Sequence, residues 1–312
     1  MLTRCSPWVA SCLTAVVLAG APPPARAAGF AIFEQGARGM GFAGAFTAQA
    51  SDPSAIFHNA AGIAFLKGKQ IYLGGTAIAP SSTFTGAEPF PGPTVTEKSD
   101  VGISVPPAAY YTQDFTDRLA FGVGVNVPFG LKTRWANPDA YTGRFVSTSA
   151  ELKGYSINPT VAYKLADRLA VGAGLDLRLS TVILERRVGV VNPFTQKVVD
   201  AADVHLESDT GFGLGFNLGV LAKPSESFSI GLSYRHKVKI DYGGSALFNP
   251  LSTGNAQLDA LVGAVLPSGA IPLSTSVEFP AFGSLGIAYR AGDWLVEGDV
   301  NYYRWSSFNR VE

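Results

Sequence analysis

Hydrophobic and polar residues alternate along most of this chain. Between Leu169 and Ser180 the odd positions are apolar, whereas the even positions hold glycine, Asp176 and Arg178 among others. Residues 211–222 and 227–242 repeat the pattern, and a period of two with one apolar face is typical of β-strands. We predict nine strands, at about residues 69–79, 101–112, 118–128, 151–165, 168–187, 207–222, 227–242, 278–290 and 293–305.

The lengths of the strands and of their connections indicate a membrane barrel. The alternation continues for longer than a strand of about 5–6 residues needs. The polar faces mix glycine with charge, as a wet or loosely filled lumen allows. Some connections are short, whereas residues 80–100, 130–150, 189–209 and 243–277 form long ones. Short turns at one end and long loops at the other are the outer-membrane pattern, which disfavours the alternative of a soluble β-sandwich.

The composition agrees with export to a membrane. Residues 1–27 contain Arg4, an apolar run at 9–20 and the cleavage pattern Ala25-Arg26-Ala27, so we interpret them as a signal peptide. Cys5 and Cys12, the two cysteines of the chain, lie within it, so no disulfide is expected after cleavage. Charged residues make up only 15% of the chain, against about 25% in soluble domains. No run of the mature chain is long and apolar enough for a membrane-spanning helix.

The mature chain would carry 22 basic and 24 acidic residues, a net charge of about −2 that argues against a nucleic-acid partner. An exported chain that is apolar, poor in charge and without spanning helices predicts a transmembrane β-barrel.

Residues 29–66 do not alternate. "GARGMGFAGAFTAQA" is rich in glycine, and "SDPSAIFHNAAGIAFL" begins like a helix, with Ser51 or Asp52 as N-cap and Pro53 in the first turn. The segment is too short for a core of its own and needs a container, which a barrel lumen would provide. We therefore predict a signal peptide at 1–27, an N-terminal plug at 28–67 and a partial barrel at 68–312.

These segments, together with "NVPFGLKTRW", "YTGRF", "LERR", "SYRHKVKIDYGG" and "NYYRWSSF", resemble the FadL family. Its members are outer-membrane channels for long-chain fatty acids and, in one branch, for aromatic hydrocarbons. The resemblance covers residues 28–312. It implies an all-β, antiparallel transmembrane barrel of 14 strands with an N-terminal hatch inside the lumen. About nine of these strands are present here, so several closing strands are expected to be missing.

The resemblance also assigns gating residues. Phe30 and the stretch Asn59-Ala60-Ala61 would belong to the hatch, where the family has Asn-Pro-Ala, so the fixed φ angle of proline is absent at Ala60. Pro128, Phe129 and Gly130 match a kink in the third strand that opens the wall sideways. A proline that cannot donate to the strand ladder and a glycine that relaxes it suit such a gap.

Arg186 matches a basic family residue that meets the carboxylate of the fatty acid. It has the parity of Asp176 and Arg178 and is predicted to face inward near the outer end of the fifth strand. The alternatives are a solvated arginine at the base of a loop and a partner of Glu185.

Two long loops are candidates for ligand capture. One carries Trp135, Tyr141 and Phe145, and the other carries Leu258, Leu261 and Val262 at helical spacing. Exposed apolar groups often mark binding surfaces, although packing among themselves or against lipid would explain these residues equally well.

We therefore predict passive uptake of long-chain fatty acids or similar hydrophobic molecules across the bacterial outer membrane, with hatch movement and lateral release. No cofactor, metal or catalytic residue is expected, and the protein should be a monomer among outer-membrane lipid and lipopolysaccharide. The alternatives are an aromatic-hydrocarbon channel, an outer-membrane lipid hydrolase and a structural or adhesive barrel. A hydrolase would need a base beside a nucleophile, and the candidates are His58, His205 and His236. A structural barrel would need neither a hatch nor a broken strand.

Overall fold

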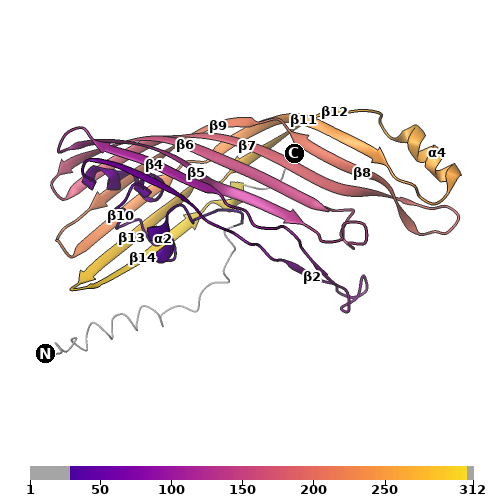
Figure 1. Cartoon of the computed structure of the whole chain (residues 1–312), viewed down its shortest axis with the longest axis horizontal. Coiled ribbons are helices and arrows are strands. Elements are labelled where there is room, and N and C mark those ends of the chain that lie inside the picture. Colours follow the sequence, from indigo (N-terminus) through magenta and orange to yellow (C-terminus); the bar gives the residue numbers. More distant parts are fainter. Residues whose placement is uncertain (1–28, 308–312) are drawn as a thin grey trace.

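A computed structural model describes residues 29–307; the predicted signal peptide and residues 308–312 lie outside this range. The described chain is dominated by one curved antiparallel sheet of twelve strands (Figure 1). Its main path follows the order β1 (Lys69–Gly75), β4 (Pro107–Asp114), β5 (Leu119–Arg134), β6 (Ser149–Ala166), β7 (Leu169–Val191), β9 (Gly211–Ala222), β10 (Phe228–Arg235), β13 (Phe282–Ala291) and β14 (Trp294–Tyr303). The all-β antiparallel fold predicted from the alternation is confirmed, and the nine strands of this path follow the nine predicted segments in order.

Three further strands, β8 (Val198–Ser208), β11 (Val238–Pro250) and β12 (Ile271–Phe279), lengthen the sheet at the end that carries the helix α4 (Ala256–Val265) (Figure 1). A separate small hairpin consists of β2 (Thr83–Thr85) and β3 (Thr96–Lys98), and a one-turn 3-10 helix, η2 (Trp305–Ser307), follows β14. The ends of the main path, β1 and β14, do not pair with each other within residues 29–307. No helix in this part of the chain has both the length and the apolarity to span a membrane.

The prediction that residues 227–242 form a single strand with one apolar face is wrong. β10 ends at Arg235 and β11 begins at Val238, and between them the buried positions change from odd to even residue numbers. In β10 the odd residues are buried, whereas in β11 the even residues Val238, Ile240 and Tyr242 are buried. β11 lies across the glycine face of β9, because a Cβ atom placed on Gly213 would be 2.5 Å from Val238 Cγ1. These glycines therefore make room for a second layer and do not line open water.

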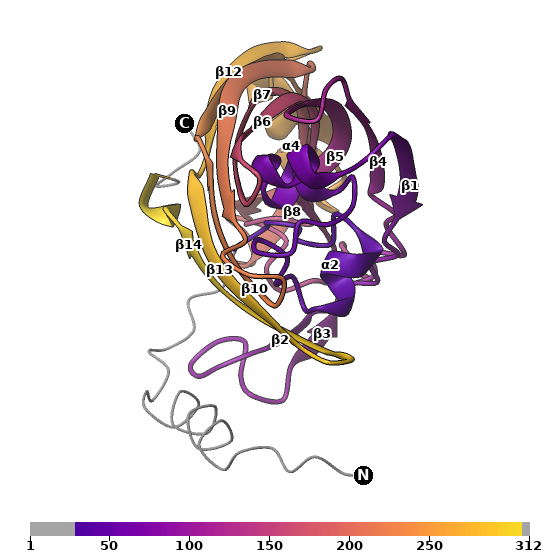
Figure 2. The same ribbon diagram turned by 90° about the vertical axis from the view of Figure 1, so that its left-hand side faces the viewer.

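The N-terminal segment, residues 29–66, lies in the hollow of the curved sheet (Figure 2). It contains α2 (Ala37–Gly41), α3 (Ala55–His58) and the 3-10 helix η1 (Ala60–Phe65). The helix η1 rests directly on the inner face of the sheet, because a Cβ atom on Gly172 would be 2.4 Å from the Ala60 carbonyl carbon. Glycine in these strands thus allows a close backbone approach.

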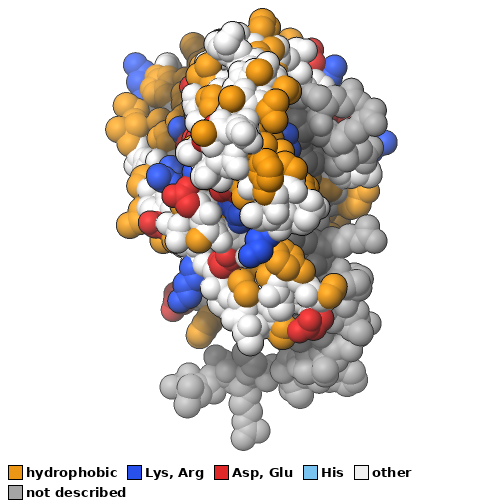
Figure 3. Space-filling model, turned by 90° about the vertical axis from the view of Figure 1, so that its right-hand side faces the viewer, with side chains coloured by type: hydrophobic (Ala, Val, Ile, Leu, Met, Phe, Trp, Pro, Cys, Tyr) orange, Lys and Arg blue, Asp and Glu red, His pale blue; other side chains and the backbone are white. Residues whose placement is uncertain are grey.

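Two apolar clusters fill the hollow. The first core joins the N-terminal segment to the sheet and includes Ile56, Phe57, Ile63, Tyr110, Leu221 and Phe282. The second core includes Phe129, Leu152, Val238, Ile240, Tyr242, Val277 and Phe279. The outer face of the sheet exposes large apolar side chains, among them Leu175, Leu179, Phe212, Leu214, Leu232 and Leu285. This outward apolar face is the one that a lipid-embedded sheet requires. At the end with the long loops, apolar side chains lie among charged ones (Figure 3).

Candidate functional site

Strand pairing is interrupted in β5 at the place where the sequence predicts a break. β4 pairs with β5 only as far as Ala109 opposite Val125, so the rest of β5 has no β4 partner. The register between β5 and β6 also shifts between Asn126 and Phe129. Pro128 lies inside this shift, where its missing N–H costs no ladder hydrogen bond.

The start of the N-terminal segment occupies this interruption. The Ile32 N–H donates to the Pro128 carbonyl at 2.9 Å, and the Gly130 N–H donates to the Phe30 carbonyl at 3.0 Å. Ala31 forms an isolated antiparallel bridge with Phe129. Residues 30–32 therefore act as a short strand laid against the unpaired edge of β5.

The ring of Phe30 anchors this short strand in the second core. Its centroid lies 5.9 Å from that of Phe129, 6.3 Å from that of Phe279 and 5.1 Å from that of Trp305, all in edge-to-face geometry. Edge-to-face pairs of this kind stabilise an aromatic cluster beyond the area that they bury.

A cavity of about 690 Å³ lies beside the interruption. Its walls come from residues 29–32, 76–80, 104–107, 127, 130–132 and 151–153. A small group of charges lies on one wall, where Glu151 accepts from Lys153 at 2.9 Å and lies 3.8 Å from the Lys132 ammonium. The volume falls within the range of small-molecule sites.

A buried group of three charges lies between the two cores. Asp176 and Arg178 come from β7 and Arg235 from β10, and their side chains are 0%, 0% and 1% exposed. One oxygen of Asp176 accepts from Arg178 at 2.6 Å and from Arg235 at 3.0 Å. The other oxygen accepts from the Ser156 hydroxyl at 2.5 Å. We call these three residues the charged cluster; it holds two cations and one anion.

Aromatic rings cover both arginines. The guanidinium of Arg178 lies 5.0 Å from the ring centroids of Phe129 and Phe279 in the second core. That of Arg235 lies 5.2 Å from the ring of Phe57 in the first core. Within residues 29–307, Nε and Nη1 of Arg178 and Nε of Arg235 have no hydrogen-bond partner. The charged cluster thus has spare N–H donors and an excess positive charge, and a carboxylate would complement both.

Arg186 lies apart from the charged cluster. It is on β7, opposite the buried Val204, but its own side chain is exposed. It lies eight positions along the strand from Arg178, a distance of about 26 Å at about 3.3 Å per residue. Sequence reasoning missed Arg235, although its parity already placed it on the polar face of its strand. The missing information was the register that brings it to Asp176.

The predicted hatch residues are buried at the centre of the N-terminal segment. Asn59 donates through Nδ2 to the carbonyls of Thr47 at 2.8 Å and of Val220 at 3.0 Å. Its Oδ1 accepts from the Ala61 N–H and so caps η1. Ala60, which replaces the family proline, begins this helix nonetheless, and both Ala60 and Ala61 are buried against the sheet.

His58 is buried beside Asn59. Burial, and secondly the positive charge of Arg235, lower the pKa of its imidazole from the usual 6.5 to about 4. Its ring packs edge-on against those of Phe46 and Phe57. His58 is therefore neutral at physiological pH and packs against Phe57 of the first core.

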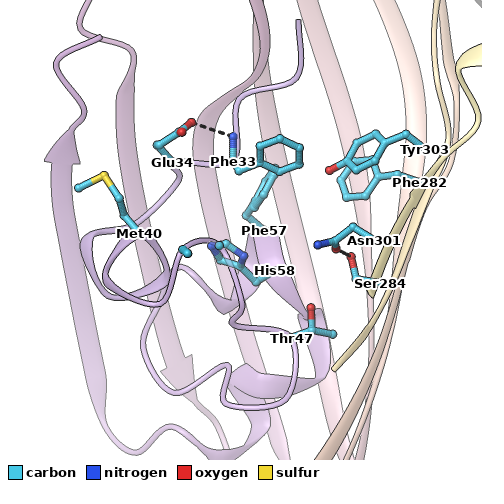
Figure 4. A pocket seen from close by; sticks show the side chains of 12 residues that line it. Phe33, Glu34, Met40, Thr47, Phe57, His58, Phe282, Ser284, Asn301 and Tyr303 are labelled. Carbon is cyan, nitrogen blue, oxygen red and sulfur yellow. Dashed lines mark hydrogen bonds between the residues drawn. The ribbon is translucent and has the colours of Figure 1, made fainter. Parts of the chain in front are cut away.

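A second cavity, of about 300 Å³, separates the N-terminal segment from β13 and β14 (Figure 4). Figure 4 shows His58 and Phe57 on one side and Phe282, Tyr303, Ser284 and Asn301 on the other. Ser284 and Asn301 hydrogen-bond to each other. The N-terminal segment is thus packed less tightly on this side than against β7 and β9.

The predicted capture residues of the first loop, Trp135, Tyr141 and Phe145, are only partly exposed. Trp135 and Tyr141 stack at 4.1 Å, and the edge of Phe84 meets Tyr141. Phe145 lies under the guanidinium of Arg144, 4.4 Å from it.

The apolar stretch at 256–265 is a helix, α4, as its spacing predicts, and Asn255 caps it. Leu258 packs inward and Val262 is half-buried, whereas Leu261 is 63% exposed. The loops therefore contain both self-packing and free apolar surface.

Comparison with known proteins gives consistent matches. The family described as "Outer membrane protein transport protein (OMPP1/FadL/TodX)" matches residues 18–312. A long-chain fatty acid transport protein of Escherichia coli O6:H1 is 25% identical, and the alignment covers 96% of this chain and 70% of the relative. Outer membrane protein P1 of Haemophilus influenzae Rd is 27% identical, with 73% and 57% covered. The chain thus spans between 57% and 70% of the length of these two relatives.

Solved structures share the fold. A FadL homologue of Pseudomonas aeruginosa matches 91% of this chain and 71% of its own, with a TM-score of 0.70 and 19% identity. The toluene transporter TbuX of Ralstonia pickettii matches 88% of this chain and 74% of its own, with a TM-score of 0.65 and 19% identity. At these identities the likeness concerns the fold alone.

Proposed function

The chain belongs to the OMPP1/FadL/TodX family of outer membrane transport proteins, and from this membership we propose that it is a passive channel for long-chain fatty acids. Membership places it in the bacterial outer membrane and makes it a transporter and not an enzyme. The fatty-acid substrate and the route described below are our proposal.

The charged cluster is the observation that carries the choice of substrate. A fatty-acid carboxylate that leaves water needs compensation of its charge. Arg178 and Arg235 share one aspartate and retain unpaired N–H donors, in the planar fork geometry that suits a carboxylate. The apolar cores on either side of the charged cluster can accept the alkyl chain.

The route follows from the position of the N-terminal segment, which we interpret as the hatch, taking residues 28–67 as its extent and residues 68–312 as barrel wall. Loop residues such as Trp135 and Leu261 would take up the ligand, and Arg186 would meet its carboxylate at the entrance. Displacement of residues 30–32 from β5 would then join the cavity of about 690 Å³ to the gap at Pro128–Gly130. The ligand would leave sideways into lipid. We expect a monomer surrounded by outer-membrane lipid and lipopolysaccharide.

Replacement of each arginine tests the substrate. A hydrogen bond to a charged group contributes about 1.5–3 kcal/mol, or about 10- to 150-fold in affinity. Arg178→Ala should weaken oleate binding by this factor and leave toluene binding unchanged. Arg178→Lys, which keeps the charge and loses the fork, should have an intermediate effect. Arg168→Ala, at an exposed turn, is the control, and heat-modifiable migration on gels checks that each variant is folded.

Intact oleate binding in folded Arg178→Ala and Arg235→Ala variants would refute the assignment of the charged cluster. If Arg186→Ala alone weakens binding, the carboxylate site lies at the outer end of β7.

An aromatic-hydrocarbon channel is the second candidate. The cluster of Phe30, Phe129, Phe279 and Trp305 beside the wall gap favours it, because a neutral aromatic ligand could replace the ring of Phe30 there. Quenching of tryptophan fluorescence by toluene but not by oleate in the wild type would decide for this candidate.

A further inference from the structure

Four consecutive main-chain N–H groups of the hatch point at two carboxylates of the barrel wall. The N–H groups of Phe46 and Thr47 donate to one oxygen of Asp299, each at 3.0 Å. Those of Ala48 and Gln49 donate to one oxygen of Glu297, at 2.7 and 3.3 Å. In the part of the chain that the structure describes, no main-chain oxygen accepts from any of the four.

This stretch of the hatch is buried against sheet positions that carry no side chain. Gly231 of β10 and Gly286 of β13 are cross-strand partners. A Cβ atom on Gly231 would fall 2.0 Å from the Thr47 carbonyl oxygen, and one on Gly286 would fall 3.0 Å from the Ala48 nitrogen. No side chain of these two residues interlocks with the hatch, so hydrogen bonds must fix its position here.

The two carboxyl groups take their hydrogen bonds from the hatch. Glu297 and Asp299 are two residues apart on the inner face of β14, and neither forms an ion pair with a lysine, arginine or histidine within residues 29–307. A run of N–H groups that point into one concavity is a typical anion site. If the hatch left, four donors and two charges would lose their partners together.

We propose that Glu297 and Asp299 form a latch that holds the hatch closed and sets how readily it opens. This inference rests on the proposed function, because a latch has a purpose only if the hatch moves during transport. In this role Glu297 and Asp299 are positioning residues that need not touch the ligand.

The latch makes a quantitative prediction. Glu297→Gln and Asp299→Asn keep the size of each side chain and remove its charge. Loss of one charge-assisted contact should raise the population of the open hatch about tenfold, and the double variant should exceed either single variant. Asn301→Ala is the matched control, because Asn301 lies on the same strand and bonds with Ser284, not with the hatch.

Leakage of a neutral sugar from liposomes containing the protein measures the open population without any assumption about the ligand. Leakage should be fastest in the double variant, slower in the single variants and at the wild-type level in Asn301→Ala. A role in barrel stability alone would lower the unfolding temperature without raising leakage through protein that is still folded. A folded double variant that leaks like the wild type overturns the latch.

Oleate binding, measured by tryptophan quenching in the same samples, separates the latch from the substrate. If the latch variants leak but neither they nor the wild type bind oleate, the latch is supported and the fatty-acid proposal is refuted. Normal oleate binding with unchanged leakage refutes the latch and leaves the substrate proposal intact.

Discussion

Protonation of His58 should loosen the hatch, because docking keeps its imidazole uncharged. The imidazole is buried between Phe46 and Phe57, and its pKa is lowered from 6.5 to about 4, first by burial and then by the charge of Arg235. A hatch that has left its position exposes His58 to water and restores the ordinary pKa. The open hatch therefore binds a proton more readily than the docked hatch.

The sign and the size follow from these two pKa values. The contribution of His58 to docking is complete above pH 6.5 and is lost progressively as the pH falls from 6.5 to 4, since protonation of its imidazole then favours the open state. Between pH 8 and pH 5 the loss is about 2 kcal/mol, and it approaches about 3 kcal/mol below pH 4. A loss of about 2 kcal/mol corresponds to about 30-fold more open hatch.

Sugar leakage from liposomes at a series of pH values measures this effect. While the hatch is mostly closed, the ratio of leakage at pH 5 to leakage at pH 8 should be about 30-fold larger in the wild type than in His58→Gln, because the other titrating groups of the hatch contact, Glu297 among them, are common to both. His58→Gln has no titrating ring, and expressing its leakage relative to its own value at pH 8 removes any constant effect of the substitution. An equally steep pH dependence in wild type and His58→Gln would refute the reasoning and place the titrating group elsewhere.

Three further outcomes are expected. Deletion of residues 30–50 should raise single-channel conductance and small-solute uptake, because it removes both the strand laid on β5 and the latched stretch; wild-type conductance would show that the segment does not plug the lumen. Gly130→Val with Pro128→Val should regularise β5 and slow oleate uptake without weakening oleate binding. The double substitution should also disturb the hatch contact, since a Cβ atom on Gly130 would be 2.9 Å from Ile32 Cδ1. Unchanged uptake speaks against lateral exit here. Leu261→Asp should slow uptake at low oleate concentration and leave stability unchanged, because this side chain is 63% exposed; normal uptake removes α4 from the capture surface.

Alternation alone predicted the nine strands of the main path, because each spans many residues with one apolar face, but it did not predict β8 and β12, which lie in segments expected to be long connections. It failed between β10 and β11, where the buried parity changes at His236 and Lys237 without a glycine or proline to mark the place. The change has a tertiary cause. β11 pairs with β8 and β12 and packs on β9, so its apolar side chains turn inward.

The candidate site was predictable in its parts and not in its assembly. Parity placed Asp176, Arg178 and Arg235 on polar faces, but Arg235 is 59 residues from Asp176, and only the register through β9 brings them together. Parity favoured Arg186 equally, but in the structure its side chain is exposed. For Glu297 and Asp299, two acids on one strand face without a nearby base were the available signal. Their partners are main-chain groups, which carry no sequence signature.

Because the charged cluster lies between two apolar cores, the interior also favours one orientation of a ligand that has an anionic head and an apolar tail. Under the proposed function, a ligand with one anionic end would be held by its head at Arg178 and Arg235, and its tail would have the second core, with Phe129 and the wall gap, on one side. The tail can then enter the surrounding lipid while the head is still neutralised, so the most costly part of the molecule to move crosses last. Passage through the wall would be polarised, tail before head, even in a passive channel such as the one we propose.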